Sequence, residues 1–234
     1  MKRSSNQIED KMIHAIIEGR YPVGSLLDSE RELANSFGVG RPTIREVLQG
    51  LATSGWITIR KGQPAMVNDY LQDGNIGAII NIVQYFDSIP DEFVLYFLEF
   101  RCAISPMYVK KAVQLNHPKV VGLLLQAETL ADTAEAYAIY DWELQKELAK
   151  LSGNPLFLLT LNSFNDAYVR MATLYFSLSF YRRSSDQYYE NLMESALQGN
   201  HAEAEEVTRG MMGKSYSLWK EHMSSPDQEE KAGQ

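Results

Sequence analysis

The first seventy residues contain arginine, lysine and small polar residues of the types that bind double-stranded DNA. The candidates are Arg31, Arg41, Thr43, Arg45, Lys61 and Gly62. The planar fork of an arginine matches the two major-groove acceptors of guanine, a contact worth about 1–3 kcal/mol of discrimination between bases. Lysine side chains, hydroxyls and backbone N–H groups bind phosphate, which positions a protein on the duplex. These residue types are therefore suited to the recognition of DNA.

Apolar spacing predicts the helices that would position these side chains. Residues 8–17 carry apolar side chains at helical period. A second helix opens at Ser29, with Glu32 three residues on in the pattern of a capping box, and ends at Gly38. A third helix spans residues 40–53, which places the candidate arginines of this helix in its first turns. Two helices joined by a short glycine-containing turn are typical of a helix-turn-helix.

The residues after the third helix predict a β-hairpin. Residues 56–60 form one expected strand and residues 65–68 a return strand, with a turn between them. Lys61 and Gly62 would lie at the tip of this hairpin, where they can meet the DNA backbone or enter a minor groove. Three helices followed by a hairpin with a basic tip form a winged helix-turn-helix, which we expect to span residues 1–69.

Charge is unevenly distributed along the chain, which has 234 residues and a formal net charge of −8. Residues 1–69 hold nine basic and eight acidic residues, so they carry +1 and the remainder carries −9. This asymmetry indicates two functions in one chain. Each candidate cation could instead be a solvated surface charge that pairs with Glu30, Glu32 or Glu46. Because four basic residues would share one face of the winged helix, we favour contact with DNA.

Three short motifs carry a resemblance to a known family. They are SERELA at residues 29–34, GVGRPTIREVL at residues 38–48 and GWI at residues 55–57. These motifs resemble the DNA-binding domain of the GntR family of bacterial transcription regulators. The resemblance implies that Arg31, Arg41 and Arg45 contact DNA, because the matching arginines do so in that family. Gly40 and Pro42 stand where the FadR branch has threonines, so two hydroxyl contacts are missing.

The remaining two thirds of the chain repeat apolar residues at helical period, without the alternation of strands. We expect a linker at residues 70–75, an all-α effector domain at residues 76–223 and a polar tail at residues 224–234. The expected helices span residues 76–86, 91–115, 117–133, 135–151, 155–180, 184–198 and 201–222. The predicted fold class is mostly α, a winged helix-turn-helix followed by an all-α bundle of six or seven helices. Such a bundle has enough core for a ligand cavity.

A winged helix joined to an all-α domain is similar to the FadR subgroup of the GntR family. Many members of that subgroup bind a divalent metal through an Asp and several His residues. This chain keeps Asp141 but has Gln145 and Tyr189 where histidines are expected, so we predict no metal. The similarity is greatest to the fatty-acid-responsive members, which implies long-chain acyl-CoA as the effector ligand and no resident cofactor.

The same resemblance implies where the effector binds. Its positions match here as Arg101, Tyr175, Ser215 and Trp219, with Met212 standing at a glycine position. By spacing alone, Met212, Ser215 and Trp219 share one face of the last helix. An arginine in an apolar helix needs an anionic partner, such as a coenzyme phosphate. The alternatives are a core stripe on the last helix and an Arg101 paired with an acidic residue of the bundle, and the residue types alone favour these.

Other classes of protein fit the sequence less well. Cys102 is the single cysteine, so no internal disulfide can form, and the longest apolar stretches are too short to span a bilayer. We therefore expect a cytoplasmic protein with no membrane partner. The sequence has no nucleophile elbow, no suitably spaced catalytic His and no Gly-rich phosphate loop, so we predict no catalytic residues and no enzyme.

We expect a homodimer that binds a pseudo-palindromic operator and releases it when long-chain acyl-CoA binds. The resemblance implies repression of fatty-acid degradation genes and activation of unsaturated fatty-acid synthesis genes. One alternative keeps DNA binding but replaces the ligand with a small organic acid. A second alternative, from another class, is an enzyme that handles acyl-CoA and carries an accessory DNA-binding domain.

Overall fold

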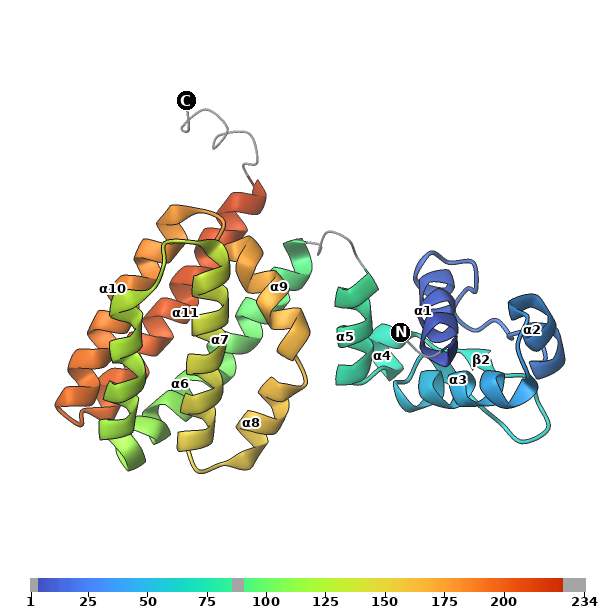
Figure 1. The fold of residues 1–234 in the computed structure, drawn as a ribbon, viewed down its shortest axis with the longest axis horizontal. Coiled ribbons are helices and arrows are strands. Elements are labelled where there is room, and N and C mark those ends of the chain that lie inside the picture. The colour runs from blue at the N-terminus through green and yellow to red at the C-terminus, as the bar shows by residue number, and fades with distance from the viewer. Residues whose placement is uncertain (1–3, 86–90, 225–234) are drawn as a thin grey trace. The chain divides into compact units, whose positions relative to one another are not determined.

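The computed structural model describes residues 4–85 and 91–224 of the chain (Figure 1). Its contacts divide the chain into two compact units, residues 1–87 and 88–234. The first unit holds helices and a small sheet, and the described part of the second unit is helical. The predicted fold class is therefore confirmed. Within these described ranges, no helix is long and apolar enough to cross a membrane.

Three helices of the first unit form the predicted helix-turn-helix arrangement. They are α1 (Ser4–Ile17), α2 (Glu30–Phe37) and α3 (Arg41–Thr53). The capping box of α2 is present, because Glu32 N–H donates to the Ser29 hydroxyl at 3.3 Å and Ser29 N–H donates to the Glu32 carboxylate at 3.0 Å. α2 ends at Gly38, whose φ of 66° favours glycine. Buried apolar side chains of α1 and α3 fill the core between the helices: Met12, Ile13, Ile16, Ile44, Val47 and Leu51.

The wing is a small antiparallel sheet. β1 (Ile57–Thr58) pairs with β2 (Met66–Val67), so both strands are shorter than the sequence predicts. A third segment, with no strand signal in the sequence, joins this sheet where Leu26 bridges to Met66. Because Leu26 precedes α2, this pairing ties the wing to the start of the helix-turn-helix and satisfies backbone groups on both segments.

Two short helices follow the wing. α4 (Tyr70–Asp73) lies within the predicted linker, residues 70–75. α5 (Ile76–Tyr85), which the sequence predicts as the first helix of the effector domain, packs against α1 and belongs by its contacts to the first unit. Gly55 permits the close approach of α4, because its φ is +85° and a Cβ there would lie 2.5 Å from the Asp73 carbonyl oxygen.

The second unit is a helical bundle. Its elements are α6 (Asp91–Leu124), η1 (Leu125–Thr129), α7 (Ala134–Leu151), α8 (Pro155–Asn162), α9 (Asn165–Tyr175), α10 (Ser179–Leu197) and α11 (His201–Ser224). α11 packs along α6, and α7 and α10 also pack on α6, as Figure 1 shows. α6 bends at Asn116, whose φ of −147° is not helical, at the predicted junction between two helices. Beyond Ser224, the predicted polar tail lies outside the described residues.

One predicted helix of the bundle is wrong. The single helix expected over residues 155–180 is divided at residues 163–164 into α8 and α9. α9 ends at Tyr175, and residues 179–180 already belong to α10, which begins five residues before the predicted start at residue 184. Phe164 is buried, and its ring centroid lies 5.1 Å from that of Phe97 and 5.6 Å from that of Phe100. This aromatic packing against α6 stabilises the break, because it buries a large ring that a continuous helix would place differently.

Candidate DNA-binding face and effector cavity

The start of α3 carries three of the predicted DNA contacts. Arg41 is the first residue of α3 and is exposed, Thr43 is half-buried, and Arg45 is exposed one turn further along the helix. The N-cap residue of α3 is Gly40, which supplies no side-chain cap. Because the N-terminal end of a helix is positive and α3 has no side chain to neutralise it, a phosphate suits this end.

Arg45 forms an ion pair that joins the two helices of the motif. Its Nε donates to Oε2 of Glu30 at 2.8 Å, and the two side chains are 66% and 38% exposed. Glu30 is one of the acidic partners that the sequence offered as an alternative to DNA contact. Arg31 and Arg41 are also exposed, and neither forms an ion pair with another residue of the described ranges. An exposed pair is worth at most about 1 kcal/mol, so this contact adds little to the stability of the fold.

The wing tip carries the last two predicted DNA contacts. Lys61 and Gly62 lie in the turn between β1 and β2, and both are exposed. Gly62 has a φ of +78°, and the N–H of Gln63 donates to the Arg60 carbonyl at 3.2 Å, which closes the turn. Arg60 is exposed beside Lys61, and the predicted set missed it although its charge was visible in the sequence. Contact of these residues with DNA stays a prediction.

A buried ion pair joins α6 and α7 inside the bundle. Nη2 of Arg101 lies 3.2 Å from Oδ2 of Asp141, and the two side chains are only 11% and 5% exposed. The Asp141 carboxylate also accepts hydrogen bonds from the hydroxyls of Tyr168 and Tyr189 and from the amide of Gln145. Arg101 therefore has an anionic partner within its own bundle, which is the alternative that the residue types favoured.

The surroundings of Arg101 keep its guanidinium charged. Burial lowers the pKa of Arg101, but the Asp141 carboxylate beside it acts in the opposite direction, and the pKa lies above its usual range. Burial also raises the pKa of Tyr168 well above its usual value, so its hydroxyl stays protonated and can donate to Asp141. The Arg101 guanidinium in turn lies over the Tyr168 ring, 5.4 Å from its centroid. The cluster is thus an ion pair held by hydrogen bonds.

A narrow cavity lies between α6 and α9 beside this ion pair. Its volume is about 20 Å³, which is room for a single water molecule. Arg101, Tyr168 and Tyr175 contribute polar groups to its lining, and apolar side chains such as Phe97 and Met171 form the rest. Two of the predicted effector residues, Arg101 and Tyr175, therefore line one cavity.

The other three predicted effector residues lie on α11. The Tyr175 hydroxyl donates to Ser215 at 3.0 Å, and the ring centroids of Tyr175 and Trp219 lie 6.0 Å apart. Burial raises the pKa of Tyr175 to about 12, against the hydrogen bond to Ser215, which lowers it, so the hydroxyl is protonated at neutral pH. Met212 is buried on the same helix but does not line the cavity. Effector binding by Arg101 and these residues stays a prediction.

Asp141, Gln145 and Tyr189, which stand where many members of the subgroup have metal ligands, form hydrogen bonds with one another. Tyr189 and Gln145 both donate to Oδ1 of Asp141, at 3.2 and 3.3 Å, and Arg101 lies against the other carboxylate oxygen. A single carboxylate that already pairs with a cation does not suit a divalent metal. In the part of the chain that the structure describes, no three His, Cys, Asp or Glu residues lie close enough to hold one. Tyr168 was not predicted as part of this cluster, since only the apolar helix around Arg101 indicated a buried charge.

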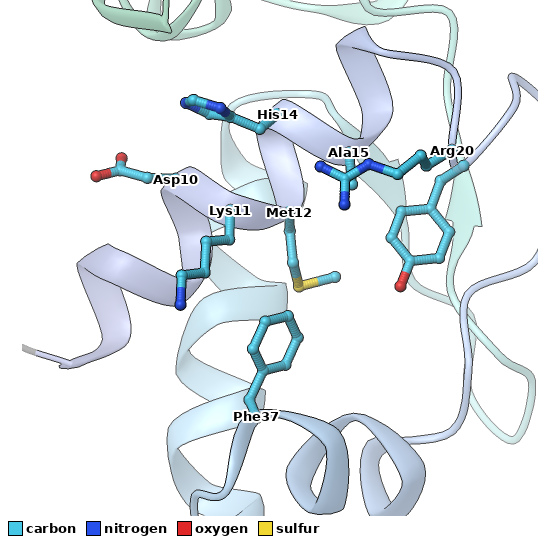
Figure 2. A pocket seen from close by; sticks show the side chains of 8 residues that line it. Asp10, Lys11, Met12, His14, Ala15, Arg20 and Phe37 are labelled. Atoms are coloured by element: carbon cyan, nitrogen blue, oxygen red, sulfur yellow. The ribbon is translucent and has the colours of Figure 1, made fainter.

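An open groove lies on the first unit between α1 and the end of α2 (Figure 2). Its volume is about 730 Å³. Figure 2 shows the side chains of Met12 and Phe37 pointing toward one another, with Lys11 and Arg20 on opposite sides in that view. Arg20 pairs with Glu18 at 2.6 Å, and an acidic side chain also lines the groove. No predicted site residue lines it, and its mixed charge selects no class of ligand.

Two family models match the chain. Residues 4–67 match the model of the bacterial regulatory proteins of the gntR family, and residues 68–229 match that of the FadR C-terminal domain. The chain belongs to the FadR branch of the GntR family. It is therefore a DNA-binding transcription regulator and not an enzyme. The second match begins at residue 68, whereas the contacts of this FadR-type chain place α4 and α5 with its first unit.

Relatives of this FadR-type regulator carry the name fatty acid metabolism regulator protein. The relative from Shewanella pealeana is 35% identical over 211 residues, which cover 90% of this chain and 88% of that protein. The relative from Edwardsiella ictaluri is 33% identical over 212 residues, with the same coverage of 90% and 88%. A solved structure of Lar, which controls expression of the Listeria monocytogenes agr system, aligns over 94% of this chain and 98% of that one. Its TM-score is 0.62 at 14% identity, so the likeness shows the shared fold alone.

Proposed function

We propose that this FadR-type transcription regulator of fatty acid metabolism binds its operator as a homodimer and releases it when long-chain acyl-CoA binds the bundle. The observation that carries the proposal is the set of contacts around Tyr175. Its hydroxyl donates to Ser215, its ring packs near Trp219, and it lines the same cavity as Arg101. An apolar wall with a few polar groups is what a thioester ligand needs. The name shared by the relatives supports a fatty-acid signal.

On the DNA side, the proposal assigns Arg41 and Arg45 to base edges and Arg31 to phosphate or base. A two-fold dimer would place two α3 helices in successive major grooves, about one helical turn apart or closer, with Lys61 at a minor groove. Residues 1–69 carry +1 and the remainder −9, so attraction to random DNA is weak. Selectivity would then depend on a few arginines, and binding would be sensitive to salt.

Entry of an acyl chain would require the bundle to open between α6 and α9. The cavity there holds about 20 Å³, whereas ligand pockets usually hold roughly 300–1,000 Å³. α9 packs against α7, and its N-cap residue, Phe164, makes no side-chain cap, so movement of α9 breaks no capping bond. Such movement would stretch the hydrogen bond between Tyr175 and Ser215. Because coupling is reciprocal, operator DNA must weaken acyl-CoA binding by the same factor.

Calorimetry tests the ligand. We would titrate the full chain with oleoyl-CoA, with coenzyme A alone and with a panel of small hydroxy and dicarboxylic acids. The proposal expects saturable heat at micromolar oleoyl-CoA and none with the small acids. No heat with oleoyl-CoA, together with heat from a small acid, would favour the alternative ligand class and overturn the acyl-CoA assignment.

A matched pair of variants tests the site. Tyr175→Phe removes the hydroxyl that donates to Ser215. Tyr188→Phe removes another buried hydroxyl, which forms a hydrogen bond of 3.3 Å with Thr208, and Tyr188 does not line the cavity. Each loses one hydrogen bond, worth about 1 kcal/mol of stability. Only Tyr175→Phe should weaken oleoyl-CoA binding. Equal affinity in the two variants would place the ligand elsewhere in the bundle.

A further inference from the structure

The ion pair of Arg45 uses only one edge of its guanidinium group. Nε donates to Oε2 of Glu30 at 2.8 Å, and within the described residues neither terminal amino group of Arg45 forms a hydrogen bond. A guanine presents its O6 and N7 acceptors as a pair, and the two terminal amino groups of an arginine match that pair. The contact with Glu30 therefore leaves free the edge that reads guanine.

The backbone that carries Glu30 is held in place without the help of Arg45. It is the first residue of α2, where the positive end of the helix favours a carboxylate. The backbone around it is fixed by the capping box between Ser29 and Glu32. The Glu30 carboxylate thus extends from a fixed backbone position on α2, from which it can orient a side chain of α3.

The three arginines of this face differ in their pairing. Arg31 follows Glu30 directly in the sequence and Arg41 opens α3, and neither forms an ion pair with another residue of the ranges 4–85 and 91–224. Arg45 is paired although its side chain is 66% exposed. An exposed pair adds little stability. Orientation of Arg45 is therefore the effect of Glu30 that its geometry supports.

We infer that Glu30 is a positioning residue, which holds Arg45 for two-point recognition of guanine and makes operator binding more selective. The inference rests on the proposed DNA-binding face. Two effects combine: the fixed guanidinium loses less freedom when it binds a guanine, and the negative carboxylate repels phosphates and so weakens attraction to random DNA. Removal of Glu30 should raise binding to random DNA and lower the preference for the operator.

The experiment measures selectivity, which a merely structural role would not move. Fluorescence anisotropy would give the affinities of the full chain for its own upstream operator, for the same duplex with each G·C pair replaced in turn, and for a random duplex. Glu30→Gln should lower the ratio of the affinity for the operator to the affinity for the random duplex by about three- to tenfold. This is part of the roughly 5- to 150-fold discrimination that a two-point guanine contact provides. The variant should lose its preference for G·C mainly at the base pair where Arg45→Ala also loses that preference.

Glu46→Gln is the matched control, because Glu46 is an exposed carboxylate next to Arg45 on α3 and its removal changes the net charge equally. It should raise both affinities alike and leave the ratio unchanged. The inference is overturned when Glu30→Gln behaves as Glu46→Gln does, or when Glu30→Gln lowers the ratio further in the Arg45→Ala background. If Arg45→Ala itself leaves operator binding intact, the proposed DNA-binding face fails, which is a separate result.

Discussion

Each unit of the molecule contains an arginine paired with a carboxylate, and the two pairs differ in their exposure to water. Arg45 and Glu30 of the first unit are 66% and 38% exposed, whereas Arg101 and Asp141 of the bundle are 11% and 5% exposed. Water screens the first pair, so it adds little stability, and the terminal amino groups of its arginine can make a further contact outside the protein. The second pair cannot lose a partner without leaving a charge buried.

The comparison indicates that burial decides whether an ion pair stabilises the fold or remains available for binding. The exposed pair contributes little to folding and is suited to a reversible contact with a ligand outside the protein. The buried pair is tied to Tyr168 and Tyr189 through the Asp141 carboxylate, so it links α6, α7, α9 and α10. Four variants test this difference, in order of decreasing effect.

Asp141→Ala should have the largest effect on stability. It leaves the Arg101 charge buried without its partner, so we expect the free energy of unfolding to fall by about 3–5 kcal/mol in urea denaturation. Glu147→Ala on the same helix is the control, because it breaks an exposed pair with Lys150 and should cost at most about 1 kcal/mol. The double variant Arg101→Met, Asp141→Leu should be more stable than Asp141→Ala. Equal losses for Asp141→Ala and Glu147→Ala would contradict the comparison.

Arg45→Ala should weaken operator binding by roughly 5- to 150-fold, the worth of about 1–3 kcal/mol in a two-point base contact. Stability should change by no more than about 0.5 kcal/mol, because the residue is exposed. Gel shifts and urea denaturation check the two quantities. Arg20→Ala, which breaks the exposed pair with Glu18, should change neither. Retained operator affinity in Arg45→Ala would refute the assignment of α3 as the recognition helix.

Lys61→Ala should weaken DNA binding by a smaller, sequence-independent factor. A lysine that neutralises one phosphate contributes about 0.9 to the slope of log affinity against log salt, so the slope should become shallower by that amount. Anisotropy titrations at several salt concentrations measure the slope. Lys119→Ala, an exposed lysine of α6 in the bundle, should leave it unchanged. An unchanged slope in Lys61→Ala would remove the wing tip from the DNA-binding face.

Glu9→Gln should produce the smallest change in stability. It tests the effect of burying a carboxylate whose neighbouring charges are negative. Burial, with the nearby charges of Asp10 and Glu46, raises the pKa of Glu9, so ionisation of Glu9 opposes folding at neutral pH. The variant should therefore be slightly more stable than the parent at pH 7, and the gain should disappear as the pH falls below 4.5. Thermal unfolding across this pH range measures it. A loss of stability at pH 7 would show that the Glu9 carboxylate makes a favourable contact.

Local features of the fold are predictable because they depend on residues a few positions apart. The capping box of Ser29 and Glu32, the end of α2 at Gly38 and the bend of α6 at Asn116 all follow from such short spacings. The break at Phe164 is different, because neither proline nor glycine marks it and its aromatic partners lie on α6. Periodicity in one segment gives no information about rings more than sixty residues away.

The candidate sites show the same division. The residue types that face DNA are predictable from the helix-turn-helix spacing, but the choice of Glu30 as the partner of Arg45 depends on how α2 and α3 pack. For Arg101, its place in an apolar helix predicts an anionic partner, which could be a coenzyme phosphate or an acidic residue of the bundle. The fold brings Asp141 of α7 against it, a contact that no pattern within α6 could specify.

The most direct test of the account is a gel shift of the full chain on the upstream region of its own gene, with and without oleoyl-CoA. We expect a specific complex that survives competitor DNA and disappears at micromolar oleoyl-CoA, while coenzyme A alone leaves it intact. A complex that persists at saturating oleoyl-CoA would contradict the proposed coupling between the bundle and the winged helix.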